Sequence, residues 1–142
     1  MITEQQKRLV QSSWAQVAPA YDKAVTLFYN RLFELDPSLR GLFNIEIERQ
    51  VQKLTATMSV VVKGLLHLEA LVPALQELGR RHSTYGVLTV HYDTVGEALV
   101  WALDQTLKQD FTPEVREAWV DTYAHLADIM RNAGAASPVP VV

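Results

Sequence analysis

The chain of 142 residues is long enough to bury one continuous core and too short to hold a second catalytic domain. Its net charge of −3, with 20% charged and 49% hydrophobic residues, is typical of a mildly acidic globular protein and does not indicate nucleic-acid binding. The sequence has no cysteine, which excludes disulfides, iron–sulfur clusters and thiol catalysis.

Apolar residues recur at three- and four-residue spacing almost throughout, without sustained alternation, so we predict helices only. In chain order, the expected helices cover about residues 4–17, 20–35, 37–43, 46–66, 73–82, 91–108 and 113–133. Thr3 and Gln6 form a capping box before the first helix, Pro19 marks the turn into the second, and Asp36 with Pro37 opens the third. About seven helices with short connections predict a packed all-α fold.

Prolines and glycines also mark where helices are expected to start and stop. Pro73 is expected in the first turn of its helix, Gly86 breaks the helical pattern, and the last helix is expected to end before Gly134. We therefore predict one domain over residues 1–133 and a disordered tail over residues 134–142.

The sequence predicts no membrane segment. The longest uncharged apolar stretch, Met58 to Val62, is far shorter than the roughly 20 residues that cross a bilayer. The chain begins MITEQQKR instead of a basic and then apolar leader, so we expect a cytoplasmic protein.

One histidine continues an apolar stripe. Leu71, Leu75, Leu78 and His82 fall at i, i+4, i+7 and i+11, so His82 is expected to point inward. Periodicity alone favours a core histidine bonded to a backbone carbonyl over a metal ligand. The other three histidines are expected to be solvated or capping: His67, His91 and His125. One inward histidine cannot form a protein-only metal site, whereas haem brings four nitrogen ligands and needs one more.

Two further polar residues interrupt apolar faces. Gln50 is the only strongly polar member of the stripe that runs from Ile47 to Leu65, and Tyr29 lies on the apolar face of the second helix. A glutamine at the edge of a stripe is often exposed, and a buried tyrosine often bonds at the margin of a core. Taken one at a time, both residues fit these structural roles better than a functional one.

Taken together, these residues resemble a known family in order and spacing. The matching pieces are Leu27–Phe33, Asp36-Pro37, Leu42–Asn44, His82 with Gly86-Val87, His91-Tyr92, Val95-Gly96, and Ala118-Trp119 with Tyr123. The chain is similar to the globin family from Leu9 to about Met130, and most similar to bacterial single-domain haemoglobins and the globin domain of flavohaemoglobins. Neuroglobin is a looser relative.

The resemblance implies a globin fold around haem b, with His82 as the proximal iron ligand. It implies that Tyr29, Gln50 and Leu54 form the distal pocket, where the gas binds. The residues expected to contact the cofactor are Phe43, Lys53, Leu54, Arg81, His82, Val87, Tyr92 and Val95. Of these, the two basic residues are expected to pair with the haem propionates.

The function that the resemblance implies is reversible, high-affinity binding of dioxygen at a five-coordinate ferrous iron, for storage, delivery or scavenging. Nitric oxide and carbon monoxide are further expected ligands. The alternative is a nitric oxide dioxygenase that uses an external reductase, so the sequence leaves open whether the protein is an enzyme, and we assign no catalytic residue. A sensor would need an output module, and a haem-free interaction module remains a further alternative.

The sequence departs from flavohaemoglobins at one point. In that family a tyrosine matching Tyr92 works with a carboxylate near the end of the last helix to polarise the proximal histidine. The corresponding stretch here, Met130–Gly134, has no carboxylate. Strong electron donation toward the iron, as peroxidase chemistry needs, is therefore not expected.

Overall fold

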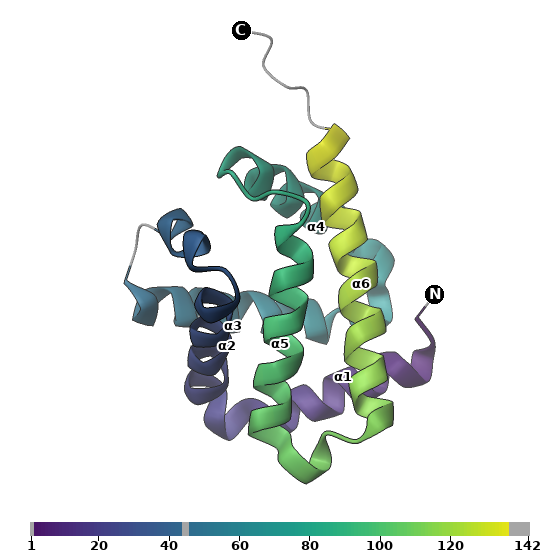
Figure 1. The fold of residues 1–142 in the computed structure, drawn as a ribbon. Helices are drawn as coiled ribbons and strands as arrows, with labels where there is room; N and C mark the ends of the chain where they lie inside the picture. Colours follow the sequence, from purple (N-terminus) through teal and green to yellow (C-terminus); the bar gives the residue numbers. More distant parts are fainter. Residues whose placement is uncertain (1, 44–45, 137–142) are drawn as a thin grey trace, which may run out of the picture.

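The computed structural model describes residues 2–43 and 46–136, which form helices joined by short connections (Figure 1). The α-helices in these ranges are α1 (Glu4–Val17), α2 (Tyr21–Leu35), α3 (Ile47–Lys63), α4 (Leu68–Thr84), α5 (His91–Leu107) and α6 (Pro113–Ala136). Short 3-10 helices lie between them: η1 (Ala18–Ala20), η2 (Pro37–Leu42), η3 (Leu65–His67) and η4 (Lys108–Asp110). No strand occurs in the described ranges, and the predicted all-α class is confirmed.

The predicted signals for helix starts are used as expected. The Thr3 hydroxyl accepts the N–H of Gln6, and the Gln6 side chain accepts the N–H of Thr3, both at 3.0 Å. Pro19 lies in η1, at the turn into α2. The Asp36 carboxylate accepts the N–H of Ser38 at 3.1 Å, at the start of η2. These bonds satisfy backbone donors that the first turn of a helix leaves free.

The segment after Asp36 is a 3-10 helix, Pro37–Leu42, where we expected an α-helix. The described residues therefore contain six α-helices instead of about seven. The segment has only six residues, with a proline at the first position and Gly41 at the fifth. A stretch this short offers too few propagating hydrogen bonds to offset the cost of nucleating an α-helix.

The start of α4 was predicted incorrectly. The helix begins at Leu68, so Pro73 lies inside it and not in its first turn. Proline cannot donate the bond to the carbonyl four residues earlier, which normally weakens a helix at that point. Here packing supports the turn before the proline, because the Leu71 side chain lies directly against Gly64. A Cβ added at Gly64 would lie only 3.0 Å from both terminal methyls of Leu71.

The end of α6 was also predicted incorrectly, because the helix passes Gly134 and reaches Ala136. Glycine is a weak helix former, but here it lets two backbones meet. A Cβ at Gly134 would lie 3.1 Å from the carbonyl oxygen of Gly79 in α4, so packing between the helices overrides the local preference. The rest of the predicted tail, residues 137–142, and Asn44 of the resemblance lie outside the described residues.

A glycine brings the backbones of α4 and α6 into close contact. A Cβ at Gly79 would collide with the backbone carbonyl of Met130 and would lie 2.6 Å from its Cα. Among the described residues, α4 packs mainly on α6, while α3 packs on α2 and α1 and has almost no contact with α4 beyond the η3 connection. The position of α4 therefore depends on α6.

Two groups of buried side chains form the core. One lies between α1, α5 and α6 and includes Trp14, Leu103 and Trp119, whose indole N–H donates to the buried Ser13 hydroxyl at 2.8 Å. The other lies between α2, α5 and η2 and includes Tyr29. Figure 1 shows α5 running through the centre of the molecule, which lets this one helix contribute to both groups.

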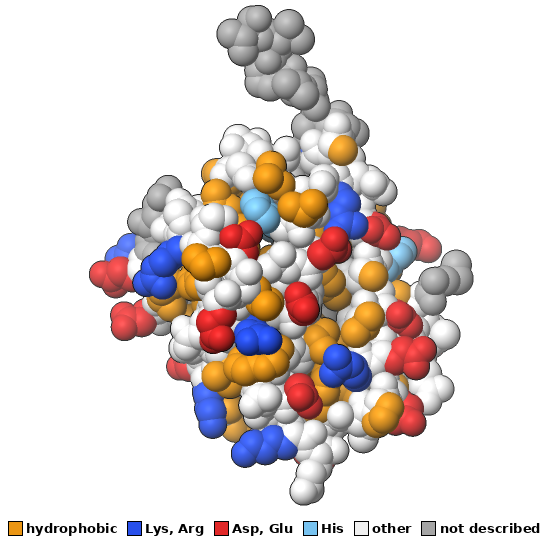
Figure 2. Space-filling view, in the orientation of Figure 1, with side chains coloured by type: hydrophobic (Ala, Val, Ile, Leu, Met, Phe, Trp, Pro, Cys, Tyr) orange, Lys and Arg blue, Asp and Glu red, His pale blue; other side chains and the backbone are white. Residues whose placement is uncertain are grey.

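The surface in Figure 2 carries lysine, arginine and acidic side chains interspersed with hydrophobic ones, and neither sign of charge dominates this face. Over residues 2–43 and 46–136, no single helix has the length and apolar character to cross a membrane. A bent pair, Ile47–Lys63 with Leu65–Thr84, reaches that length and composition only when its two halves are taken together.

The contact between α4 and α6 predicts that replacing Gly79 by alanine destabilises the protein, which is the opposite of the usual effect in a helix. In most helices Gly→Ala stabilises by roughly 0.5–1 kcal/mol, but at Gly79 the added Cβ meets backbone that cannot move aside. Gly79→Ala is expected to lower the free energy of unfolding by about 1–3 kcal/mol, measured by urea denaturation. The matched control is Gly41→Ala, where a Cβ would meet nothing within 4 Å. Equal effects of the two substitutions would refute the packing argument.

Candidate functional site

A buried tyrosine on α2 lies beside a glutamine on α3. Tyr29 is only 2% exposed, Gln50 is half-buried, and the Gln50 side chain is near enough to the Tyr29 hydroxyl to influence its pKa. The ring of Phe43 meets the Tyr29 ring edge-on, with 5.5 Å between the ring centroids. The structure thus brings together two of the three predicted distal residues and the aromatic residue expected to stack on the cofactor.

The surroundings of Tyr29 keep its hydroxyl protonated. Burial raises the pKa of Tyr29 to about 12, although the Gln50 side chain acts in the opposite direction. Burial dominates because the phenolate would lose the water that solvates its charge. At neutral pH the hydroxyl is therefore a neutral group able to donate a hydrogen bond.

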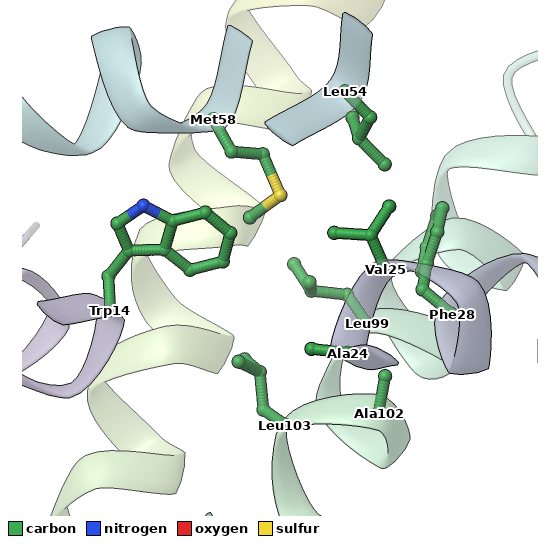
Figure 3. Close-up of a pocket in the computed structure, with 9 residues that line it drawn as sticks. All are labelled: Trp14, Ala24, Val25, Phe28, Leu54, Met58, Leu99, Ala102 and Leu103. Atoms are coloured by element: carbon green, nitrogen blue, oxygen red, sulfur yellow. The ribbon is translucent and has the colours of Figure 1, made fainter. Parts of the chain in front are cut away.

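Leu54, the third predicted distal residue, borders an apolar cavity (Figure 3). The side chains around this cavity are Trp14, Ala24, Val25, Phe28, Leu54, Met58, Leu99, Ala102 and Leu103. Figure 3 shows Leu54 and the Met58 thioether reaching into it from α3. Because its lining offers almost no hydrogen-bond partners, the space suits a small apolar molecule better than water. Neither Tyr29 nor Gln50 lines this cavity.

Predicted cofactor contacts also share the core around Tyr29. Phe43, Leu54 and Val95 are partly buried and pack against the buried group that contains Tyr29. Each comes from a different segment: the end of η2, α3 and α5. Leu54, a member of the predicted stripe on α3, therefore lies in the same apolar region as Phe43 and Val95.

His82 lies in the last turn of α4 and is half-buried. Its carbonyl accepts the N–H of Val87 at 2.9 Å, closing the turn that follows the helix. That turn needs Gly86, whose φ of +93° lies in the region that favours glycine. Burial and the neighbouring charge of Arg81 lower the pKa of His82, so the imidazole is neutral at pH 7. A neutral imidazole keeps one unprotonated nitrogen for a metal.

Tyr92, in the first turn of α5, lies beside this histidine. Its hydroxyl oxygen is 3.4 Å from Nδ1 of His82, and the two rings are 6.2 Å apart. The resemblance placed both residues on the cofactor, and the structure places them together on one side of the site. The contact engages Nδ1, so Nε2 is the nitrogen left for a ligand.

Sequence reasoning missed the groups that surround Tyr92. The hydroxyl of Tyr123 in α6 donates to the backbone carbonyl of Tyr92 at 2.6 Å, and the Arg131 guanidinium lies 5.4 Å from the Tyr92 ring centroid. A signal was available, because Tyr123 and Arg131 are eight residues apart and hence on one face of a helix. That spacing alone does not say which helix the face meets.

The remaining predicted positions are at the surface. Lys53 and Arg81 are exposed, and Nε of Arg81 lies 3.9 Å from the Glu77 carboxylate on its own helix. Their pairing with haem propionates stays a prediction. His67 and His125 are exposed.

His91 is the first residue of α5, but its side chain binds the turn before the helix and does not cap it, because α5 has no side-chain cap hydrogen bond. Its Nδ1 accepts the N–H of Leu88 at 2.9 Å, and its Nε2 lies 3.9 Å from a carboxylate oxygen of Asp36. The ring thereby links the turn before α5 to the start of η2.

The donor set fits haem better than a bare metal ion. Within the described residues, no group of three or more histidine or acidic side chains could hold a metal ion. A porphyrin brings its own four nitrogens and requires only one imidazole and an apolar environment. His82 supplies the imidazole, and Phe43, Leu54 and Val95 supply apolar surface.

A protein-family model described as Globin matches residues 26–130. The chain is 30% identical to a neuroglobin of Chaenocephalus aceratus over 149 aligned positions, which cover 94% of this chain and 93% of that protein. It is 29% identical to a flavohemoprotein of Rhizobium meliloti (strain 1021), and the match covers 92% of this chain but only 33% of the flavohemoprotein.

A solved structure shows the same arrangement of helices. It is an engineered carbene transferase, described as a putative nitric oxide dioxygenase from Rhodothermus marinus. The two folds superpose with a TM-score of 0.85 at 29% sequence identity, covering 95% of this chain and 94% of the other. The predicted globin fold is confirmed.

Proposed function

The chain belongs to the globin family, whose members bind haem and small gas ligands, and from this premise we propose that it binds dioxygen reversibly and with high affinity at haem b. In this proposal His82 is the iron ligand, and the gas approaches the side where Tyr29, Gln50 and Leu54 lie. Because α3 carries no histidine, no imidazole from this helix would compete with the gas for the iron, and we expect a five-coordinate ferrous state. The role is storage, delivery or scavenging of dioxygen.

The observation that carries this proposal is the placement of the half-buried Gln50 side chain beside the buried Tyr29 hydroxyl. When bound, haem supplies a ferrous iron that polarises dioxygen and makes it a hydrogen-bond acceptor. The Tyr29 hydroxyl and the Gln50 amide can both donate to such a ligand. Carbon monoxide is less polar and gains less from the same donors.

The proximal residues hold and orient the imidazole. With Nε2 directed to the iron, the Nδ1–H of His82 donates to the Tyr92 hydroxyl oxygen, which fixes the tautomer and the ring orientation. Phe43, Val87 and Val95 cover the porphyrin and exclude water. Lys53 and Arg81 would pair with its carboxylates at the surface, where both side chains are exposed.

Tyr29→Phe tests the donor role of the hydroxyl. A hydrogen bond worth about 1–1.5 kcal/mol corresponds to an increase of about 5- to 13-fold in the rate of dioxygen release. Stopped-flow measurement should show a smaller increase for carbon monoxide. The ratio of the dioxygen release rate in Tyr29→Phe to that in the wild type is expected to stay constant from pH 6 to pH 9. Burial raises the pKa of Tyr29 to about 12, so the hydroxyl stays protonated over this range.

The matched control for this experiment is Tyr85→Phe, which removes a hydroxyl from a side chain that is 65% exposed. It should leave both release rates unchanged. Equal acceleration for the two gases in Tyr29→Phe would remove this residue from the mechanism.

His82→Gly tests the iron ligand. Protein produced with a supply of haem is expected to show a Soret absorption band, and the substitution is expected to abolish or strongly shift it. Added imidazole should restore the band, because it replaces the deleted side chain without a covalent link. His67→Gly, at an exposed position, is the control. A colourless wild-type protein, or an unchanged band in His82→Gly, would show that this histidine does not hold haem.

Nitric oxide dioxygenation is the second candidate, and the likeness to the Rhodothermus marinus protein favours it. In this reaction one dioxygen, one nitric oxide and one electron give one nitrate, and Tyr29 and Gln50 would hold the dioxygen in place. The electron would come from a reductase, a partner suggested by the match to part of a flavohemoprotein.

Rapid mixing separates the two candidates. The oxygenated protein is mixed with nitric oxide, nitrate is measured, and turnover is then followed with a reductase and its electron source. Sustained formation of one nitrate per nitric oxide would establish the enzymatic role. A single turnover followed by persistent ferric protein would favour dioxygen binding as the function.

A further inference from the structure

An arginine near the end of α6 lies over the ring of Tyr92. The Cζ atom of Arg131 is 5.4 Å from the ring centroid, and its side chain is 27% exposed. Two of its nitrogens bind two carboxylates, of Asp93 on α5 and Asp128 on α6, each at 3.1 Å. Single ion pairs at a surface contribute little, but a planar guanidinium held by two carboxylates and a ring has one defined position.

A second residue of α6, Tyr123, also contacts the first turn of α5. The Tyr123 hydroxyl donates to the Tyr92 carbonyl at 2.6 Å, and the Tyr123 ring lies against Gly96, where a Cβ would come within 2.7 Å of it. Tyr92 is 6% exposed. Tyr123 thus restrains the backbone of Tyr92, whereas Arg131 restrains its ring and the neighbouring Asp93.

We propose that Arg131 is a positioning residue for the proximal histidine, acting through Tyr92. The contacts form one series: Arg131 covers the Tyr92 ring, and the Tyr92 hydroxyl meets Nδ1 of His82 at 3.4 Å. The inference rests on the proposed function, in which His82 binds the iron. It adds a residue outside the haem contacts that sets how firmly the imidazole is oriented.

The chemistry of this position supports the inference. The end of α6 presents a cation to Tyr92, and Met130–Gly134 contains no carboxylate. A cation over the ring face is attracted to the π electrons and fixes the ring, but it cannot accept a proton from the phenol as a carboxylate can. Tyr92 therefore orients the imidazole without drawing strongly on its proton.

The test follows the iron–histidine stretching band of the ferrous, ligand-free, haem-loaded protein by resonance Raman spectroscopy. This band responds to the hydrogen bond and orientation of the proximal imidazole. Arg131→Gln is expected to broaden it and shift it to lower frequency, and Tyr92→Phe to shift it further. In the double variant Arg131→Gln/Tyr92→Phe, the arginine should have no additional effect, since its influence passes through the missing hydroxyl.

The control is Arg8→Gln, which removes an exposed arginine paired with Glu4 on α1 and should leave the band unchanged. An unchanged band in Arg131→Gln would overturn the inference even if stability falls. So would a shift of equal size when Arg131→Gln is made with and without the Tyr92 hydroxyl.

Should Arg131→Gln not fold, Asp93→Asn removes one of the two carboxylates that hold Arg131 and must shift the band in the same direction. Loss of this inference leaves the proposed function standing, because Arg131→Gln would still bind haem and dioxygen. A wild-type protein without haem, or an unchanged Soret band in His82→Gly, overturns both.

Discussion

The backbone contact between α4 and α6 determines where the functional site can form. Gly79 and Gly134 allow the two helices to approach more closely than any side chain permits, and α4 has little other support among the described residues. His82 lies at the end of α4, so its position relative to the rest of the molecule is fixed through this contact. The same helix, α6, carries Tyr123 and Arg131 to Tyr92, and it therefore controls both the ligand and its hydrogen-bond partner.

The surroundings of Tyr29 and those of His82 differ in how deeply they are buried and in what that burial does. On the Tyr29 side, burial keeps a phenol neutral and beside an amide, which leaves hydrogen-bond donors in a region with few competing water molecules. On the His82 side, the imidazole is only half-buried and its partner is linked to a network of charges that reaches the surface. The first side is suited to stabilising a polar ligand, whereas the second is suited to orienting the iron ligand.

Much of the fold and part of the site could be predicted from local patterns. The capping box at Thr3, the break at Gly86 and the apolar stripes identify the helices, because capping and periodicity depend on residues within one or two turns. The ends of α4 and α6 could not be predicted in this way. There, packing of Leu71 on Gly64 and of Gly134 on Gly79 outweighs the local preferences of proline and glycine.

The sequence by itself determined the all-α class, the absence of cysteine chemistry and the resemblance that singles out His82, Tyr29 and Gln50. These conclusions follow from composition, spacing and residue type, which need no knowledge of distant contacts. Only the tertiary structure decided that Tyr29 lies beside Gln50, that Tyr92 meets His82, and that Arg131 covers Tyr92. Each of these pairs joins two helices, and the helix that a given face meets depends on packing between backbones far apart in the chain.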